Sequence, residues 1–180
     1  MLAEGFEFQI GCGIMRKTFE VSVEKEQLIF SAAHFITFAD NICESIHGHN
    51  YRVRCHVSGD LEQNSYVVDF IALRDHLLKL TSQWDHHVLL PTKHETIRVE
   101  VEENEVVARF ENRRWVFPAD DCALLEIDNT TAARLAELIA ADVVDGLLNA
   151  NQVSWKKLSV GVDENEGQWA FCHLENDGVS

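Results

Sequence analysis

The sequence is organised around residues 43–51, which read C-E-S-I-H-G-H-N-Y. Within this stretch, His47 and His49 are separated by a single residue, Gly48. In an extended backbone, successive side chains point to opposite faces, so both imidazoles lie on one face and Gly48 lies on the other. A glycine here also leaves room for the chain to approach whatever the two histidines hold. The spacing therefore favours a strand that presents a pair of ligands.

A third histidine, His34, lies just upstream in the segment 30–35, F-S-A-A-H-F. If this segment forms a neighbouring strand, it supplies a third imidazole nitrogen beside His47 and His49. Three neutral imidazoles with an open fourth position are the ligand set of a catalytic zinc site, whereas a structural site is closed by a fourth protein ligand. Cys43, four residues before His47, is then available near the open position as a nucleophile or a base. We therefore predict a Zn²⁺ site.

Composition sets limits on the class of protein. The chain has 180 residues and is 46% hydrophobic, which is enough for one globular domain with a real core. No apolar run has the length of a membrane helix, and the N-terminus lacks the pattern of a signal peptide, so we expect no membrane partner. The net charge of −15 argues against a nucleic-acid partner. The five scattered cysteines fit a reducing, cytoplasmic location.

The expected domain runs over residues 19–176, and residues 1–18 form an N-terminal extension of uncertain order. Whether the protein starts at Met1 or Met15 stays open. Alternation predicts one bulged strand or two strands over 19–34 and a further strand over 51–57. A helix is predicted to start near Asp69.

A second helix is expected to follow the polar run 129–131. The closing hairpin pairs 158–162 with 169–174 and has Glu164 at the tip of its first strand. Residues 92–123 are interpreted as an acidic hairpin with a possible third strand. Its role is open between a lid, an oligomer contact and a solvated decoration, and the last is favoured. The order of elements predicts an α+β fold, a four-stranded antiparallel sheet with two helices packed on one face.

The two histidine segments, together with 84–89, W-D-H-H-V-L, resemble the 6-pyruvoyltetrahydropterin synthase / 6-carboxytetrahydropterin synthase family. The resemblance runs from about residue 19 to residue 174 and implies that the hairpin at 92–123 is an insertion. It implies the tunnelling fold, in which protomers join their sheets into a barrel-like ring, as trimers that stack into hexamers. It also implies active sites between subunits of a homo-oligomer, where Cys43 of one protomer meets Asp85 and His86 of another.

The same resemblance implies a role for each candidate residue. His34, His47 and His49 bind zinc, and Cys43 is the base. Asp85 orients His86, which relays the proton. Glu164 anchors the pterin ring, since a carboxylate accepts two N–H groups side by side. Thr131 is a further substrate-binding candidate, in the element that opens the second helix.

One departure from the family pattern concerns Ala133, which replaces a glutamate in the element that resembles N-P-T-x-E. The short C-x-x-x-H-G-H spacing resembles the 6-carboxytetrahydropterin branch of deazapurine (queuosine) biosynthesis. The predicted function is a zinc-dependent lyase that converts 7,8-dihydroneopterin triphosphate to 6-carboxy-5,6,7,8-tetrahydropterin. The alternatives are a 6-pyruvoyltetrahydropterin synthase or another pterin-converting enzyme, and a non-catalytic zinc-containing paralogue that binds some other ligand. The sequence does not rank Lys17, Arg52, Arg54 and Lys93 as triphosphate-binding groups.

Overall fold

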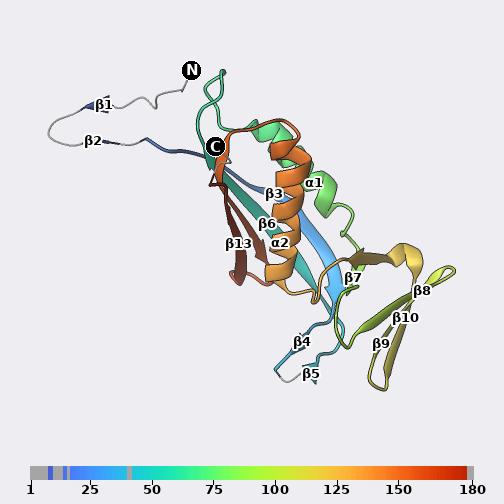
Figure 1. Ribbon diagram of the computed structural model, residues 1–180. Helices are drawn as coiled ribbons and strands as arrows, with labels where there is room; N and C mark the ends of the chain where they lie inside the picture. The colour runs from blue at the N-terminus through green and yellow to red at the C-terminus, as the bar shows by residue number, and fades with distance from the viewer. Residues whose placement is uncertain (1–7, 10–13, 16, 40–41, 178–180) are drawn as a thin grey trace.

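The computed structural model describes residues 8–9, 14–15, 17–39 and 42–177 (Figure 1). Its main body is a six-stranded mixed sheet with the order β11-β7-β3-β6-β12-β13. The strands are β3 (Phe19–His34), β6 (His47–Gly59), β7 (His87–Pro91), β11 (Cys122–Leu125), β12 (Trp155–Asp163) and β13 (Trp169–Glu175).

Four of these strands, β3, β6, β12 and β13, form the antiparallel sheet that the sequence predicts. The α+β fold is therefore confirmed. The structure adds β7 and β11, which extend the sheet through parallel pairing with β3 and with each other. The alternation pattern misses these two strands because they are short and do not alternate; β7, for instance, ends in three consecutive buried residues.

Strand β3 contains a bulge that decides which way His34 points. Its pairing with β6 shifts between Glu24 and Ile29, so the residues between them face a much shorter stretch of β6. Before the shift the odd-numbered Val21 and Val23 are buried, and after it the even-numbered residues from Leu28 to His34 are buried. A one-residue change of phase moves every following side chain to the other face. Without the bulge, His34 would face away from the core.

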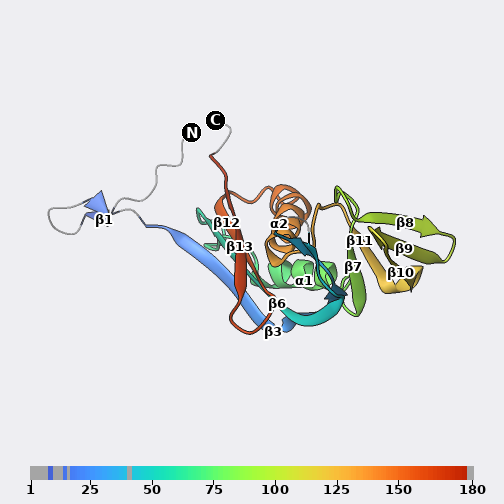
Figure 2. The same cartoon turned by 90° about the horizontal axis from the view of Figure 1, so that it is seen from below.

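Two helices cover one face of the sheet (Figure 2). Helix α1 (Phe70–Thr81) starts at Asp69, whose carboxylate caps the backbone N–H groups of the first turn, and buries Leu73 and Leu77. Phe70, in the first turn beside the cap, is 57% exposed.

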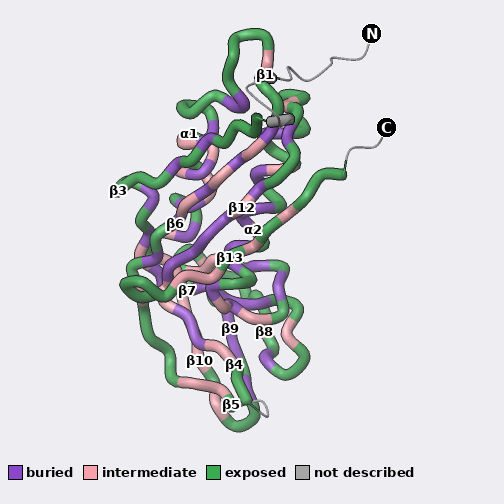
Figure 3. Tube along the Cα trace, turned by 90° about the vertical axis from the view of Figure 1, so that its left-hand side faces the viewer, coloured by how far each residue is buried: buried purple, intermediate pink, exposed green. Residues whose placement is uncertain are grey.

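Helix α2 (Ala132–Val143) is capped by Thr131 and continues as the π-helical turn η2 (Val144–Asn149). Both helices contribute to one core with the inner face of the sheet. Figure 3 shows that β12 is largely buried, and its last four residues, 160–163, are all buried. Because the core lies between helices and sheet, side chains on the inner face at the ends of β3 and β6 are held in fixed positions.

The inserted segment forms a separate three-stranded sheet with the order β10-β9-β8. Its strands are β8 (Arg98–Glu102), β9 (Glu105–Phe110) and β10 (Arg113–Pro118), followed by the short 3₁₀ helix η1 (Ala119–Asp121). The middle strand β9 is mostly buried, and it forms a second apolar core with Phe35 and Leu90 of the main body. The expectation of a solvated decoration is therefore wrong, because the insertion buries its own apolar side against the end of the main sheet.

Two short ladders complete the described chain. Strand β4 (Thr37–Phe38) pairs with β5 (Ile42–Cys43), and β1 (Phe8–Gln9) pairs with β2 (Ile14–Met15). The rest of the predicted extension, residues 1–7, 10–13 and 16, lies outside the described residues. The cysteines at 43, 55, 122 and 172 are free. None of the helices in the described part of the chain combines the length and apolar character needed to span a membrane.

Candidate metal centre and active site

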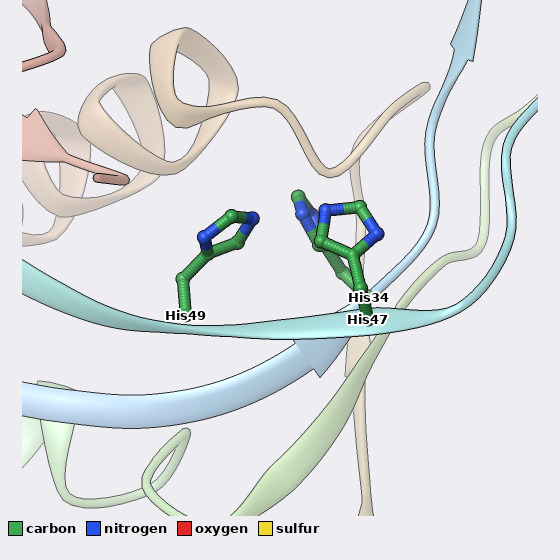
Figure 4. A group of neighbouring side chains, drawn as sticks. All are labelled: His34, His47 and His49. Carbon is green, nitrogen blue, oxygen red and sulfur yellow. The ribbon is translucent and has the colours of Figure 1, made fainter.

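Three histidines converge where β3 ends and β6 begins (Figure 4). His34 is paired directly with His47 across the two strands, and His49 is paired with Ala32. All three rings lie on the face of the sheet that the helices cover, and each offers one nitrogen within 4.8 Å of the other two. The cluster predicted from the spacing in the sequence is therefore formed.

Backbone carbonyls fix the orientation of two of the rings. Nδ1 of His34 lies 2.9 Å from the carbonyl oxygen of Thr130, and Nδ1 of His47 lies 2.9 Å from that of Ser45. A carbonyl oxygen only accepts, so each Nδ1 carries the hydrogen and donates it. In the neutral ring Nε2 then holds a free lone pair. This outer contact is typical of metal-binding histidines, whose second nitrogen is held by a carbonyl or carboxylate.

The polar atoms around this point have few partners. Among the described residues, Nε2 of His34, Nε2 of His49 and the hydroxyl of Tyr51 are buried and accept or donate no hydrogen bond of good geometry. Burial is also the largest influence that lowers the pKa of His49, which favours its neutral form. Buried polar groups without partners are uncommon, and a bound cation would satisfy both Nε2 lone pairs. The residues present therefore fit a divalent metal.

Glu164 follows β12 and faces the three histidines. Its Oε1 lies 3.0 Å from Nε2 of His34 and 3.6 Å from Nε2 of His49. The contact with His34 is the largest influence that holds the pKa of Glu164 below its ordinary value. The buried neighbour Asp163 fixes the turn by accepting hydrogen bonds from the backbone of Gly167 and Gln168. The structure therefore brings Glu164 to the histidine cluster.

Cys43 ends the two-residue strand β5 and is half-buried against the second apolar core. Burial raises the pKa of its thiol above the ordinary value, and the cation of Arg113 opposes that effect. The thiol belongs to the loop that leads into His47. Cys43, the candidate nucleophile or base, is therefore close in sequence to the histidines, but it belongs to the separate two-stranded ladder of β4 and β5.

Asp85 and His86 lie between the end of α1 and the start of β7, the strand that pairs with β3. Oδ1 of Asp85 accepts a hydrogen bond of 2.8 Å from the backbone of Ser31, which is the first cause of its lowered pKa, and Oδ2 lies 2.9 Å from Nδ1 of His86. The His86 side chain is 81% exposed and borders a hollow with Ser31 and Asn50, residues that alternate with the buried ones. Among the described residues, no hydrogen bond or ion pair joins Asp85 or His86 to Cys43.

The segment 129–131 has a function that sequence reasoning missed. It was predicted as a helix start with Thr131 as a substrate-binding candidate, yet the Thr130 carbonyl orients His34 and the Asn129 side chain donates to the Thr37 carbonyl. Thr131 is the N-cap of α2, and Ala133 is exposed in the first turn. Three consecutive polar residues before a helix were the available indication, but their partners lie more than ninety residues away in sequence.

The fold and the site define this chain as an α+β protein with a three-histidine metal-site candidate on paired central strands. It belongs to the 6-pyruvoyl tetrahydropterin synthase family, whose model matches residues 21–175. The family consists of tetrahydropterin synthases, enzymes of the lyase type. The family resemblance drawn from the three motifs is thereby confirmed.

Several relatives are known by name or structure. A protein of Methanocaldococcus jannaschii, provisionally named 6-carboxy-5,6,7,8-tetrahydropterin synthase, is 32% identical over 146 residues, covering 79% of this chain and 88% of the relative. The crystal structure of 6-pyruvoyl tetrahydropterin synthase from Plasmodium vivax has a TM-score of 0.82 at 28% identity, covering 89% of this chain and 99% of that one. The Plasmodium falciparum structure has a TM-score of 0.80 at 29% identity, covering 88% and 99%.

Proposed function

We propose that this protein is a zinc-dependent lyase that converts 7,8-dihydroneopterin triphosphate and one water molecule to 6-carboxy-5,6,7,8-tetrahydropterin, with release of acetaldehyde and triphosphate. The observation that supports it most is the convergence of three imidazoles, two of which have Nδ1 held by a backbone carbonyl so that Nε2 is left for a metal, on a chain that also keeps Cys43, Asp85 and His86. A zinc-binding module without catalysis would need the imidazoles but neither a base nor a relay. The non-catalytic alternative is therefore disfavoured.

The residues divide the chemistry between them. His34, His47 and His49 would hold the zinc, which supplies Lewis-acid polarisation of the hydroxyls on the substrate side chain when bound. The Cys43 thiolate takes a proton from that side chain. Asp85 holds His86 by the 2.9 Å contact, and His86 relays the proton. Glu164 accepts N–H groups of the pterin ring, and Thr131 lies at the start of the helix beside this site.

The same geometry supports an active site shared between subunits. Within one chain His86 borders a hollow that is also lined by Ser31, Asn50 and His49, whereas the rings of the three histidines point toward the helices. A second protomer can bring its own Asp85 and His86 to Cys43. The strands β13 and β11 at the two edges of the main sheet leave backbone groups available for pairing with a neighbour. We therefore propose a homo-oligomer, a trimer or hexamer.

A 6-pyruvoyltetrahydropterin synthase activity is the second candidate. The solved relatives carry that name, and one Plasmodium vivax structure is described as the alanine mutant of a catalytic glutamate. This chain has Glu44 beside Cys43, but the Glu44 carboxylate already accepts a 2.9 Å hydrogen bond from the backbone of Ile36. The curated relatives and the short spacing between Cys43 and His47 favour the 6-carboxy product.

The decisive experiment is a product assay. We expect purified, zinc-loaded protein to convert 7,8-dihydroneopterin triphosphate to 6-carboxy-5,6,7,8-tetrahydropterin, identified by mass, together with one equivalent of acetaldehyde. A 6-pyruvoyl product would replace the first proposal by the second. Unchanged substrate in the presence of a filled zinc site would support the non-catalytic paralogue and would remove both proposals.

Replacing Glu164 with glutamine tests the pterin anchor. We expect E164Q to keep its zinc and to raise KM by about ten- to hundredfold, because the amide has the shape of the carboxylate but loses a charge-assisted hydrogen bond, a change of about 1.5–3 kcal/mol. Steady-state kinetics and metal analysis of the same sample measure both quantities. Loss of zinc from E164Q at an unchanged KM would instead identify Glu164 as a metal ligand, an alternative that its 3.0 Å distance to His34 makes worth excluding.

A further inference from the structure

The insertion contacts the loop that carries Cys43 through one side chain. Arg113, the first residue of β10, uses Nη1 to donate a 2.8 Å hydrogen bond to the carbonyl oxygen of Cys43 and a 2.9 Å hydrogen bond to that of Glu44. Two successive carbonyls accept from the same guanidinium nitrogen. A hydrogen bond that involves a charged donor is about twice as strong as a neutral one, so this contact restrains the backbone on both sides of the peptide bond.

The guanidinium is itself held in place. Its central carbon lies 4.6 Å from the centroid of the Trp115 ring, a cation–π contact. Trp115 in turn stacks on Phe35, with ring centroids 4.4 Å apart and an angle of 18° between the planes. Phe35 follows His34 directly in the chain and is completely buried. The restraint on Cys43 is therefore anchored to the residue next to a metal-ligand candidate.

The loop around Cys43 has few other long-range restraints in the described part of the chain. Its ladder consists of β4 and β5, two residues each, and Glu44 contacts the backbone of Ile36 in both directions. The facing strand β4 is held through Thr37, whose carbonyl accepts from Asn129 and whose hydroxyl lies 2.7 Å from Nε2 of His94 in the insertion. Cys43 also packs against the apolar core that the insertion forms with Phe35 and Leu90. Without the insertion, the position of the thiol would depend on this short ladder and on the contacts of Glu44 and Asn129.

We propose that Arg113 is the positioning residue for Cys43 and that the insertion at 92–123 serves as the frame that fixes the catalytic loop. The assignment rests on the proposed role of Cys43 as the base. Arg113 acts through the backbone and the charge that it places near the thiol, without contacting substrate. A thiol displaced by about 1 Å from its productive position is expected to slow proton transfer about a hundredfold.

The test compares R113M with R113K and with R114M, a control at the next, exposed position of β10. All proteins are loaded with zinc and assayed with 7,8-dihydroneopterin triphosphate. We expect R113M to lower kcat by about ten- to hundredfold with unchanged KM and zinc content, because only the position of the base is altered. R113K, which keeps the charge, should restore part of kcat, and R114M should match the wild type.

A second measurement reports on the thiol without requiring turnover. Iodoacetamide alkylation is followed peptide by peptide over a range of pH, and Cys172, a half-buried thiol on β13 whose pKa burial also raises, is the internal reference. In R113M the alkylation midpoint of Cys43 should move to higher pH, because the thiolate loses a nearby cation, while R113K keeps the midpoint and Cys172 does not change.

The outcomes separate the two proposals. Unchanged kcat and an unchanged Cys43 profile in R113M would overturn the positioning role, as would a parallel change at Cys172 or a loss of zinc, which would indicate general destabilisation. If the wild-type protein shows no turnover, the proposed function fails, and the alkylation profile alone still decides whether Arg113 controls Cys43.

Discussion

The C43A variant is expected to lose turnover while it keeps its zinc. The metal-site candidate consists of three histidines and does not include Cys43, so removing the thiol leaves this cluster unchanged. Its side chain is half-buried, and alanine fills most of the same space, so the fold should persist. General-base catalysis contributes about 10²–10⁴ in rate, and we therefore expect kcat to fall by at least about a hundredfold. Product formation and metal content are measured on the same preparation.

The matched control for this substitution is C172A. Cys172 is also half-buried, and burial also raises the pKa of its thiol, but it lies on β13, away from the loop of Cys43. We expect C172A to turn over substrate at the wild-type rate. Retained activity in C43A would remove Cys43 from the mechanism and direct attention to the neighbouring carboxylate of Glu44, for which E44Q is the corresponding test.

The core of the site could be predicted from the sequence because it depends on short-range geometry. His47 and His49 share a face of one strand by alternation alone, and the direct pairing of β3 with β6 brings His34 beside them. The bulge in β3 was visible as a break in alternation near Lys25, and it sets the phase that turns His34 toward the helices. These features follow from the alternation of side chains along a strand and from the register in which β3 pairs with β6.

Other parts of the site depend on contacts between distant segments. The hydrogen bonds from Arg113 to the carbonyls of Cys43 and Glu44 join residues about seventy positions apart, and no pattern in an acidic hairpin indicates them. The contact between His34 and the carbonyl of Thr130 uses a backbone atom, which any residue type supplies. The position of Asp85 and His86 relative to Cys43 depends on a second chain under the proposed assembly. Sequence patterns report such contacts poorly because side-chain identity does not determine them.

The H49A variant is expected to lose stoichiometric zinc and, with it, turnover. His49 is the suitable ligand to remove because, among the described residues, no backbone carbonyl holds its ring as that of Thr130 holds His34, and its side chain is partly exposed whereas that of His34 is completely buried. Loss of one of three imidazoles should weaken zinc binding by more than the tenfold to hundredfold that loss of an outer-shell partner costs. Metal analysis after dialysis, at micromolar protein, measures the effect directly.

Thermal unfolding gives a readout of the same site that does not involve activity. A ligand that binds only the folded state stabilises it by about 4 kcal/mol at a thousandfold excess over Kd, so added zinc should raise the Tm of the wild-type protein and leave that of H49A nearly unchanged. The matched control is H56A, on the same strand but on the opposite face, where Nδ1 of His56 lies 3.4 Å from the exposed Glu20 carboxylate. H56A should respond to zinc as the wild type does. If H49A retained both zinc and the Tm response, the three-histidine centre would have to be replaced by one in which the Glu164 carboxylate binds the metal, since its Oε1 lies 3.0 Å from Nε2 of His34.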